Sequence, residues 1–93
     1  MSTNKQHERM IEIRQRLTDR FHPKSLKIHD DSRHHVGHLG AKEGLGHFSI
    51  EIISDAFMGK NLLECHKLIY EALGDLMQTE IHALRIIQAK APT

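Results

Sequence analysis

Residues 59–73 of this sequence read Gly59-Lys-Asn-Leu-Leu-Glu-Cys-His-Lys-Leu-Ile-Tyr-Glu-Ala-Leu73. Apolar residues recur there and just beyond, at Leu62, Ile69, Leu73 and Leu76. This spacing is typical of a helix with one buried face. Position 66 belongs to the same series and holds a histidine. The pattern therefore predicts a helix that packs on a core and carries an imidazole within its apolar stripe.

A histidine in an apolar stripe has two interpretations. Burying a polar group without a hydrogen-bond partner costs about 1–3 kcal/mol, so His66 needs a partner. That partner is either a backbone carbonyl inside the core or a ligand at the rim of the core. The residues alone leave both interpretations open.

Length and composition predict one small globular domain spanning residues 1–93, with its core at about 4–90. Hydrophobic residues make up 39% of the chain and charged residues 27%. No apolar run approaches the roughly 20 residues of a membrane helix, and the first residues lack an apolar signal region. The single cysteine fits a reducing compartment, and we expect a cytoplasmic protein without a membrane partner.

The first part of the chain predicts a helix that Pro23 ends. Thr3 and Gln6 have the spacing of a capping box. One face is apolar, and we expect the charged residues of the other face to be solvated. The apolar face comprises Met10, Ile13, Leu17 and Phe21, and the charged face Glu8, Arg9, Glu12, Arg16 and Arg20.

Strands are predicted at 25–30, 47–54 and 82–89, where apolar residues alternate or run together. A turn at 55–59, a helix capped by Asn61 and ending near Gly74, and a short helix at 75–80 lie between the last two strands. The predicted class is α+β, in the order α-β-β-α-α-β, with helices on one face of a three-stranded sheet. We expect one shared core, formed by Met10, Ile13, Leu17, Phe48, Ile50, Ile52, Ile69 and Leu73.

The loop between the first two strands, residues 31–46, is long, rich in glycine and poor in residues that could pack. Loops of this length inside a compact domain are often functional. Nine histidines occur in the chain, and four of them fall in or beside this loop: His34, His35, His38 and His47. Histidine-rich tracts often bind metals, but a solvated loop without a ligand explains the composition equally well.

In this order of elements the sequence resembles the BolA family over roughly residues 8–90. The resemblance rests on five short segments: 30–38 (Asp-Asp-Ser-Arg-His-His-Val-Gly-His), 47–57 (His-Phe-Ser-Ile-Glu-Ile-Ile-Ser-Asp-Ala-Phe), 57–59, 66–70 and 82–84. It implies a class II KH-like fold. It also implies an adaptor that pairs with a monothiol, CGFS-type glutaredoxin and shares a bridging two-iron two-sulfur cluster, with glutathione supplied by the partner. No cofactor is expected to be needed for folding.

The family's invariant histidine corresponds to His66, and its second ligand lies in the first interstrand loop. That loop contains no cysteine here, so the chain resembles the histidine subgroup. His38 matches the subgroup best, and His34 and His35 are alternatives. Cys65 adjoins His66, but successive side chains on a helix diverge by about 100° and do not face one site. A helix cysteine is more often a small buried hydrophobe.

The family is also described as DNA-binding regulators of stress response and cell morphology. A modest basic surface could come from Lys60, Lys67, Arg85 and Lys90, although scattered solubilising charge explains these residues as well. The net charge of +1 neither requires nor excludes a nucleic-acid partner. Two further alternatives are a free-standing metal-binding module built on the histidine loop and a homodimer when the partner is absent. No Ser-His-Asp arrangement, and no Cys-His arrangement with a third group to orient it, is visible, so we do not expect an enzyme.

Overall fold

The computed structural model describes residues 5–31 and 46–92 of the chain. Its elements follow the predicted order, with a short 3-10 helix, η3, added between the second strand and the second helix. The bounds are α1 Lys5–Phe21, β1 Ser25–Asp30, β2 Gly46–Ile53, η3 Asp55–Phe57, α2 Leu62–Leu73, α3 Leu76–Thr79 and β3 Ile81–Lys90. The predicted strands are confirmed, with β2 shifted by one residue and β3 extended by one residue at each end. The capping box at Thr3 lies outside the described residues.

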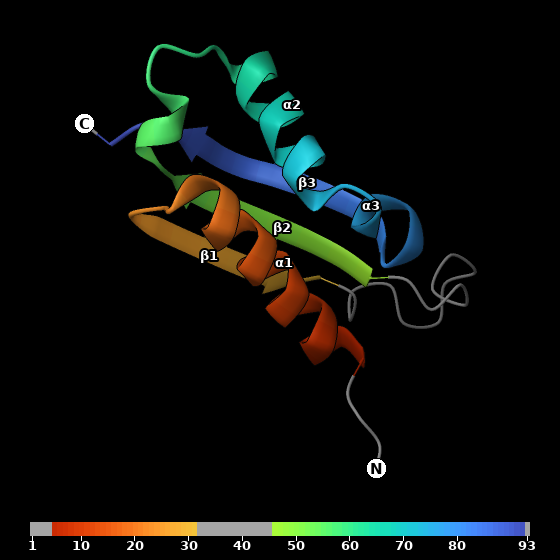
Figure 1. The fold of residues 1–93 in the computed structure, drawn as a ribbon. Coiled ribbons are helices and arrows are strands. Elements are labelled where there is room, and N and C mark those ends of the chain that lie inside the picture. Colours follow the sequence, from red (N-terminus) through yellow and green to blue (C-terminus); the bar gives the residue numbers. More distant parts are fainter. Residues whose placement is uncertain (1–4, 32–45, 93) are drawn as a thin grey trace.

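The three strands form one sheet in the order β1-β2-β3. β1 and β2 are antiparallel, with Ile28 opposite Ile50, and β2 and β3 are parallel, with Ile50 opposite Ile86. Figure 1 shows α1 and α2 on the same face of this sheet, α1 over β1 and β2, and α2 along β3. The predicted α+β architecture is therefore confirmed, whereas its assignment to the class II KH-like folds stays a prediction.

The core lies between the helices and the covered face of the sheet. It contains seven of the eight residues predicted for it, and Met10 packs against its edge. Phe48, Ile50 and Ile52 alternate along β2 and are all buried, as expected for the central strand. The other buried residues of the core are Phe21, Ile28, Phe57, Cys65, Leu76, Ile81 and Ala89.

The apolar stripe predicted for α2 is wrong at its first turn. Leu62 is 62% exposed, whereas Cys65 is 2% exposed and belongs to the core. The buried face of α2 is therefore Cys65, Ile69 and Leu73, which follow one another at steps of four. His66 lies beside this face and is partly buried. The prediction is confirmed at Ile69, Leu73 and Leu76, which are buried, and is wrong at Leu62, because Cys65 rather than Leu62 begins the buried face.

The ends of α2 form as predicted. Asn61 accepts a hydrogen bond from the Glu64 N–H, and the Glu64 carboxylate accepts one from the Asn61 N–H, which completes a capping box. Gly59 and Gly74 have φ angles of 74° and 53°, in the region that only glycine enters readily. Gly74 donates its N–H to the carbonyl of Tyr70 and ends the helix.

Two arginines predicted to be solvated instead hold α1 to the rest of the fold. Arg9 is only 7% exposed, and its Nε lies 2.8 Å from Oε1 of Glu80. The Arg16 guanidinium donates to the Leu73 carbonyl at 2.9 Å and to Asp75 at 3.1 Å. The Asp75 hydrogen bond raises the pKa of Arg16 further above its ordinary value. The Arg16 contacts fix α1 against the end of α2 and the Arg9 contact fixes it against the end of α3, which the sequence pattern of α1 could not show.

Replacing Ser54 with alanine is expected to destabilise the fold by about 1–3 kcal/mol, because one buried and one partly buried backbone group lose a partner. Ser54 is fully buried; its hydroxyl donates to the Phe21 carbonyl at 2.6 Å and accepts from the Ala56 N–H at 3.0 Å. Chemical denaturation measures the change, and Ser25→Ala, at a half-buried strand end, is the control. Equal effects of both substitutions would contradict this role of Ser54.

Candidate functional site

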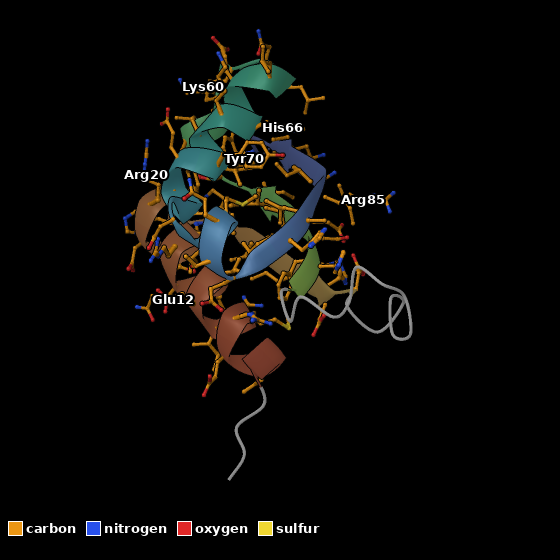
Figure 2. The ribbon with its side chains drawn as sticks, turned by 90° about the vertical axis from the view of Figure 1, so that its right-hand side faces the viewer. Glu12, Arg20, Lys60, His66, Tyr70 and Arg85 are labelled. Carbon is orange, nitrogen blue, oxygen red and sulfur yellow. The ribbon has the colours of Figure 1, made fainter. Side chains whose placement is uncertain are left out.

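His66 lies on the flank of α2, one helical turn before Tyr70. Figure 2 shows both side chains on the side of α2 next to β3. The ring nitrogen Nε2 of His66 is shielded from solvent, and it has no hydrogen-bond partner within residues 5–31 and 46–92. Buried polar atoms are nearly always hydrogen-bonded, so an unbonded ring nitrogen requires an explanation. One interpretation of the sequence was that His66 bonds to a backbone carbonyl in the core. Among the described residues, Nε2 of His66 makes no such hydrogen bond.

Exposed apolar side chains surround His66 on its helix. Leu62, His66 and Tyr70 follow at steps of four and therefore share one flank of α2. Leu62 is 62% exposed and Tyr70 41%, Leu63 on the same turn as Leu62 is 64% exposed, and Met58 in the segment before the helix is 63% exposed. Contiguous apolar side chains on a surface often mark an interaction site. His66 thus lies within a surface suited to a protein partner.

The loop histidines predicted as the second ligand, His38 with the alternatives His34 and His35, lie outside the described residues. The structure fixes only where the loop leaves and rejoins the sheet. Asp31 donates its N–H to the carbonyl of His47 at 2.7 Å, and Gly46 donates its N–H to Glu80 at 3.0 Å. Among the residues that the structure describes, no group of three or more His, Cys, Asp or Glu side chains could hold a metal ion.

Cys65 is buried among the core residues of α2, as predicted for a small hydrophobe. Burial raises the pKa of the Cys65 thiol above its ordinary value. Because the thiolate is the form that binds metals and attacks electrophiles, this position disfavours both roles. Although His66 and Cys65 are adjacent in the sequence, Cys65 lies in the core and His66 lies on the partly exposed flank of α2.

Alkylation of Cys65 by iodoacetamide at mildly alkaline pH is therefore expected to be much slower in the folded protein than in the denatured chain. The raised pKa keeps the thiol protonated, and the core blocks access to it. Mass spectrometry of the modified fraction over time measures the ratio. Similar rates with and without denaturant would show that this thiol is open to solvent and reactive.

The four residues predicted to contact nucleic acid come from two parts of the fold. Lys60 and Lys67 line a shallow depression together with Glu64 and Glu71, which offset their charge. Arg85 and Lys90 lie on β3, and Figure 2 shows Lys60 and Arg85 on opposite sides of the molecule. Lys60 and Arg85 are therefore far apart on the surface, and a role of the four residues in binding nucleic acid stays a prediction.

The sequence analysis did not predict a pair of stacked histidine rings, His47 and His82. The rings of His47 and His82 stack with centroids 4.9 Å apart and planes 19° apart. His47 is at the start of β2 and His82 at the start of β3, and the two strands are parallel neighbours. Both histidines are the first residues of predicted strands, which is visible in the sequence. Their stacking could be predicted only once it was known that these two strands are parallel neighbours.

Comparison with known proteins gives a consistent result. A sequence model described as BolA-like protein matches residues 17–93. SufE-like protein 1 of Arabidopsis thaliana, chloroplastic/mitochondrial, is 39% identical over 89 residues, which are 90% of this chain and 24% of that protein. The DNA-binding transcriptional regulator BolA of Escherichia coli is 32% identical over 74 residues, 80% of this chain and 68% of the regulator.

A solved structure, the BolA domain of SufE1 from Arabidopsis thaliana, superposes with a TM-score of 0.75 at 40% identity and covers 88% of this chain and 90% of that domain. The chain thus corresponds to nearly all of that domain but to only about a quarter of SufE-like protein 1. In the described ranges, none of the helices combines the length and apolar character that a membrane crossing requires.

Proposed function

This chain belongs to the BolA-like protein family, and from that premise we propose that it is an adaptor for a monothiol glutaredoxin with which it holds a bridging two-iron two-sulfur cluster. A relative named as a transcriptional regulator supports a regulatory role for this chain. The partner and the cluster are the proposal. According to this proposal, the chain takes part in iron–sulfur or redox homeostasis.

The observation that carries the proposal is the unbonded Nε2 of His66. A buried nitrogen without a partner among the described residues costs stability in the isolated chain. A ligand that engages this nitrogen would remove the cost. Imidazole nitrogen is a competent iron ligand, so the chemistry of His66 fits the proposed group.

His66 and a loop histidine, His38 or in its place His34 or His35, would hold the cluster on this side. Histidine in place of thiolate at one iron raises the reduction potential of a two-iron two-sulfur cluster. The capping box at Asn61 and the buried face of α2 fix the helix that carries His66, so this chain presents one preorganised nitrogen. The partner would supply its thiolate and glutathione.

The apolar side chains around His66 support a protein partner rather than a free metal ion. Leu62 and Leu63, one helical turn before His66, are each more than 60% exposed, and Nε2 of His66 has no hydrogen-bond partner among the described residues. A docked partner would cover these side chains and shield the cluster from water. A free-standing metal module built on the loop would leave them uncovered.

Anaerobic reconstitution with a monothiol glutaredoxin tests the proposal. A mixture of both proteins, iron, sulfide and glutathione is expected to give a visible absorption and circular dichroism spectrum that differs from that of the glutaredoxin alone. The two proteins are expected to elute together in size-exclusion chromatography. Identical spectra with and without this chain would reject the proposal, and a spectrum formed by this chain alone would favour the free-standing metal module.

A second candidate function is a DNA-binding regulator of transcription. The observation that favours it is the 32% identity to a protein named DNA-binding transcriptional regulator BolA, of which the chain covers 68%. Binding to DNA is expected to weaken with rising salt, with a shallow slope of about three to five phosphates because few basic side chains cluster. Absence of any binding at about 50 mM salt would reject this function.

A further inference from the structure

The face of the sheet that points away from the helices carries a depression of about 620 Å³. Its lining includes His29, Asp31, His47, Ser49, Arg85 and Ile87. The strand register places His29 opposite Ser49 and Ser49 opposite Arg85, so one row of side chains crosses all three strands. Ser49, only 3% exposed, lies at the floor of this row, and its exposed neighbours His29 and Arg85 flank it.

The acidic groups on this face are already engaged. Nε2 of His29 lies 2.8 Å from Oε2 of Glu51, and the Ser49 hydroxyl donates to Oδ2 of Asp31. Arg85 is exposed and makes no ion pair with any residue in the described part of the chain. Figure 2 shows its side chain projecting from β3 into solvent. The face therefore offers a free guanidinium, whose planar fork matches a phosphate.

His82, on the same strand as Arg85, adds a flat ring, and Ile87, in the same depression, adds an apolar side chain. His82 is exposed and stacks on His47 at 4.9 Å between ring centroids. Ile87 is 48% exposed and lines the same depression. Unpaired bases stack on aromatic rings, including imidazole, and on arginine planes, and this stacking tolerates any sequence.

We propose that this open face of the sheet binds single-stranded nucleic acid, with Arg85 on a phosphate and a base stacked against the exposed ring of His82. The proposal rests on the DNA-binding alternative and gives it a location. A sheet face has no projecting helix or ribbon to enter a major groove, so bases are reached here only where they are unpaired. Of the residues predicted from the sequence, only Arg85 lines this depression.

Fluorescence anisotropy tests the proposal with a short, labelled, mixed-sequence DNA single strand, and with the same strand annealed to its complement, at about 50 mM salt. The single strand is expected to bind more tightly than the duplex. Arg85→Ala should weaken single-strand binding about tenfold, and Arg85→Lys should restore part of the loss, since the charge returns without the fork. His82→Ala should weaken binding about fivefold or more.

Lys60→Ala is the matched control, because it removes the same charge from the opposite side of the molecule. It should change the affinity by less than about twofold. Equal losses for Lys60→Ala and Arg85→Ala would overturn the location, as would tighter binding of the duplex.

Two more outcomes separate the alternatives. If the protein binds DNA and Arg85→Ala leaves the affinity unchanged, the regulator function stands and this face is the wrong one. If the protein binds neither form of DNA, both the location and the regulator function fail. Sedimentation shows whether Arg85→Ala instead abolishes self-association, in which case the face joins two copies of this chain and the proposal is overturned.

Discussion

Replacing His66 with alanine is expected to abolish the mixed-ligand spectrum of the cluster reconstituted with a monothiol glutaredoxin, while the fold stays nearly intact. The ring is only partly buried, so its loss leaves a small cavity. Its Nε2 makes no hydrogen bond to the described residues, so no such contact is lost from the isolated chain. The whole effect should therefore fall on ligation. Pulsed electron paramagnetic resonance of the reduced complex measures it, since strong histidine-nitrogen coupling to iron should disappear.

His82→Ala is the matched control, because it removes an exposed imidazole that stacks on His47, on β3 rather than on α2. It should leave the nitrogen coupling unchanged. His38→Ala should weaken the coupling without abolishing it, since His34 and His35 in the same loop could take its place. Nitrogen coupling that survives His66→Ala, or a cluster that requires Cys65, would refute the assignment of His66 as ligand.

The order of elements could be predicted because period, caps and breakers are local properties of the sequence. Phe48, Ile50 and Ile52 alternate, Asn61 precedes Glu64 by three residues, and Gly74 follows the last helical residue. Each of these signals acts within a few residues, so no tertiary information was needed. The structure reproduces all three, as a buried central strand, a capping box and a helix end.

The predictions that failed depend on tertiary contacts. Leu62 has the spacing of a buried residue, but it lies in the first turn of α2 and is 62% exposed, so helical spacing alone did not decide its burial. Arg9 looked solvated because its partner Glu80 lies 71 positions away. Periodicity assigns a face to a helix, but it does not say where the core ends or which charges meet across the fold.

The candidate site was identified for a partly incorrect reason. His66 stood out because it appeared to interrupt an apolar stripe, whereas Cys65 belongs to the buried face and His66 lies on its flank. The family resemblance pointed to the same histidine independently. The row His29–Ser49–Arg85 could not be predicted, because it depends on the register of three strands rather than on any local pattern.

Leu73→Ala is expected to lower the free energy of unfolding by about 2–5 kcal/mol, the range for leucine in a well-packed core. Leu73 is 0% exposed and ends the buried face of α2. Its backbone carbonyl accepts the 2.9 Å hydrogen bond from Arg16, and alanine keeps that carbonyl. The loss should therefore report on the missing side-chain volume alone. Urea denaturation measures it, with an unchanged dependence on urea showing that the unfolding reaction is the same.

Leu62→Ala makes the same chemical change on the same helix, at a side chain that is 62% exposed. The stripe inferred from spacing would make both leucines core residues with similar costs. The observed packing instead predicts a change within about 0.5 kcal/mol at position 62, as for most surface substitutions. Similar costs at both positions would show that the first turn of α2 packs on the core after all. A cost below about 0.5 kcal/mol at Leu73 would show that α2 is misplaced on the sheet, because no fully buried leucine is removed so cheaply.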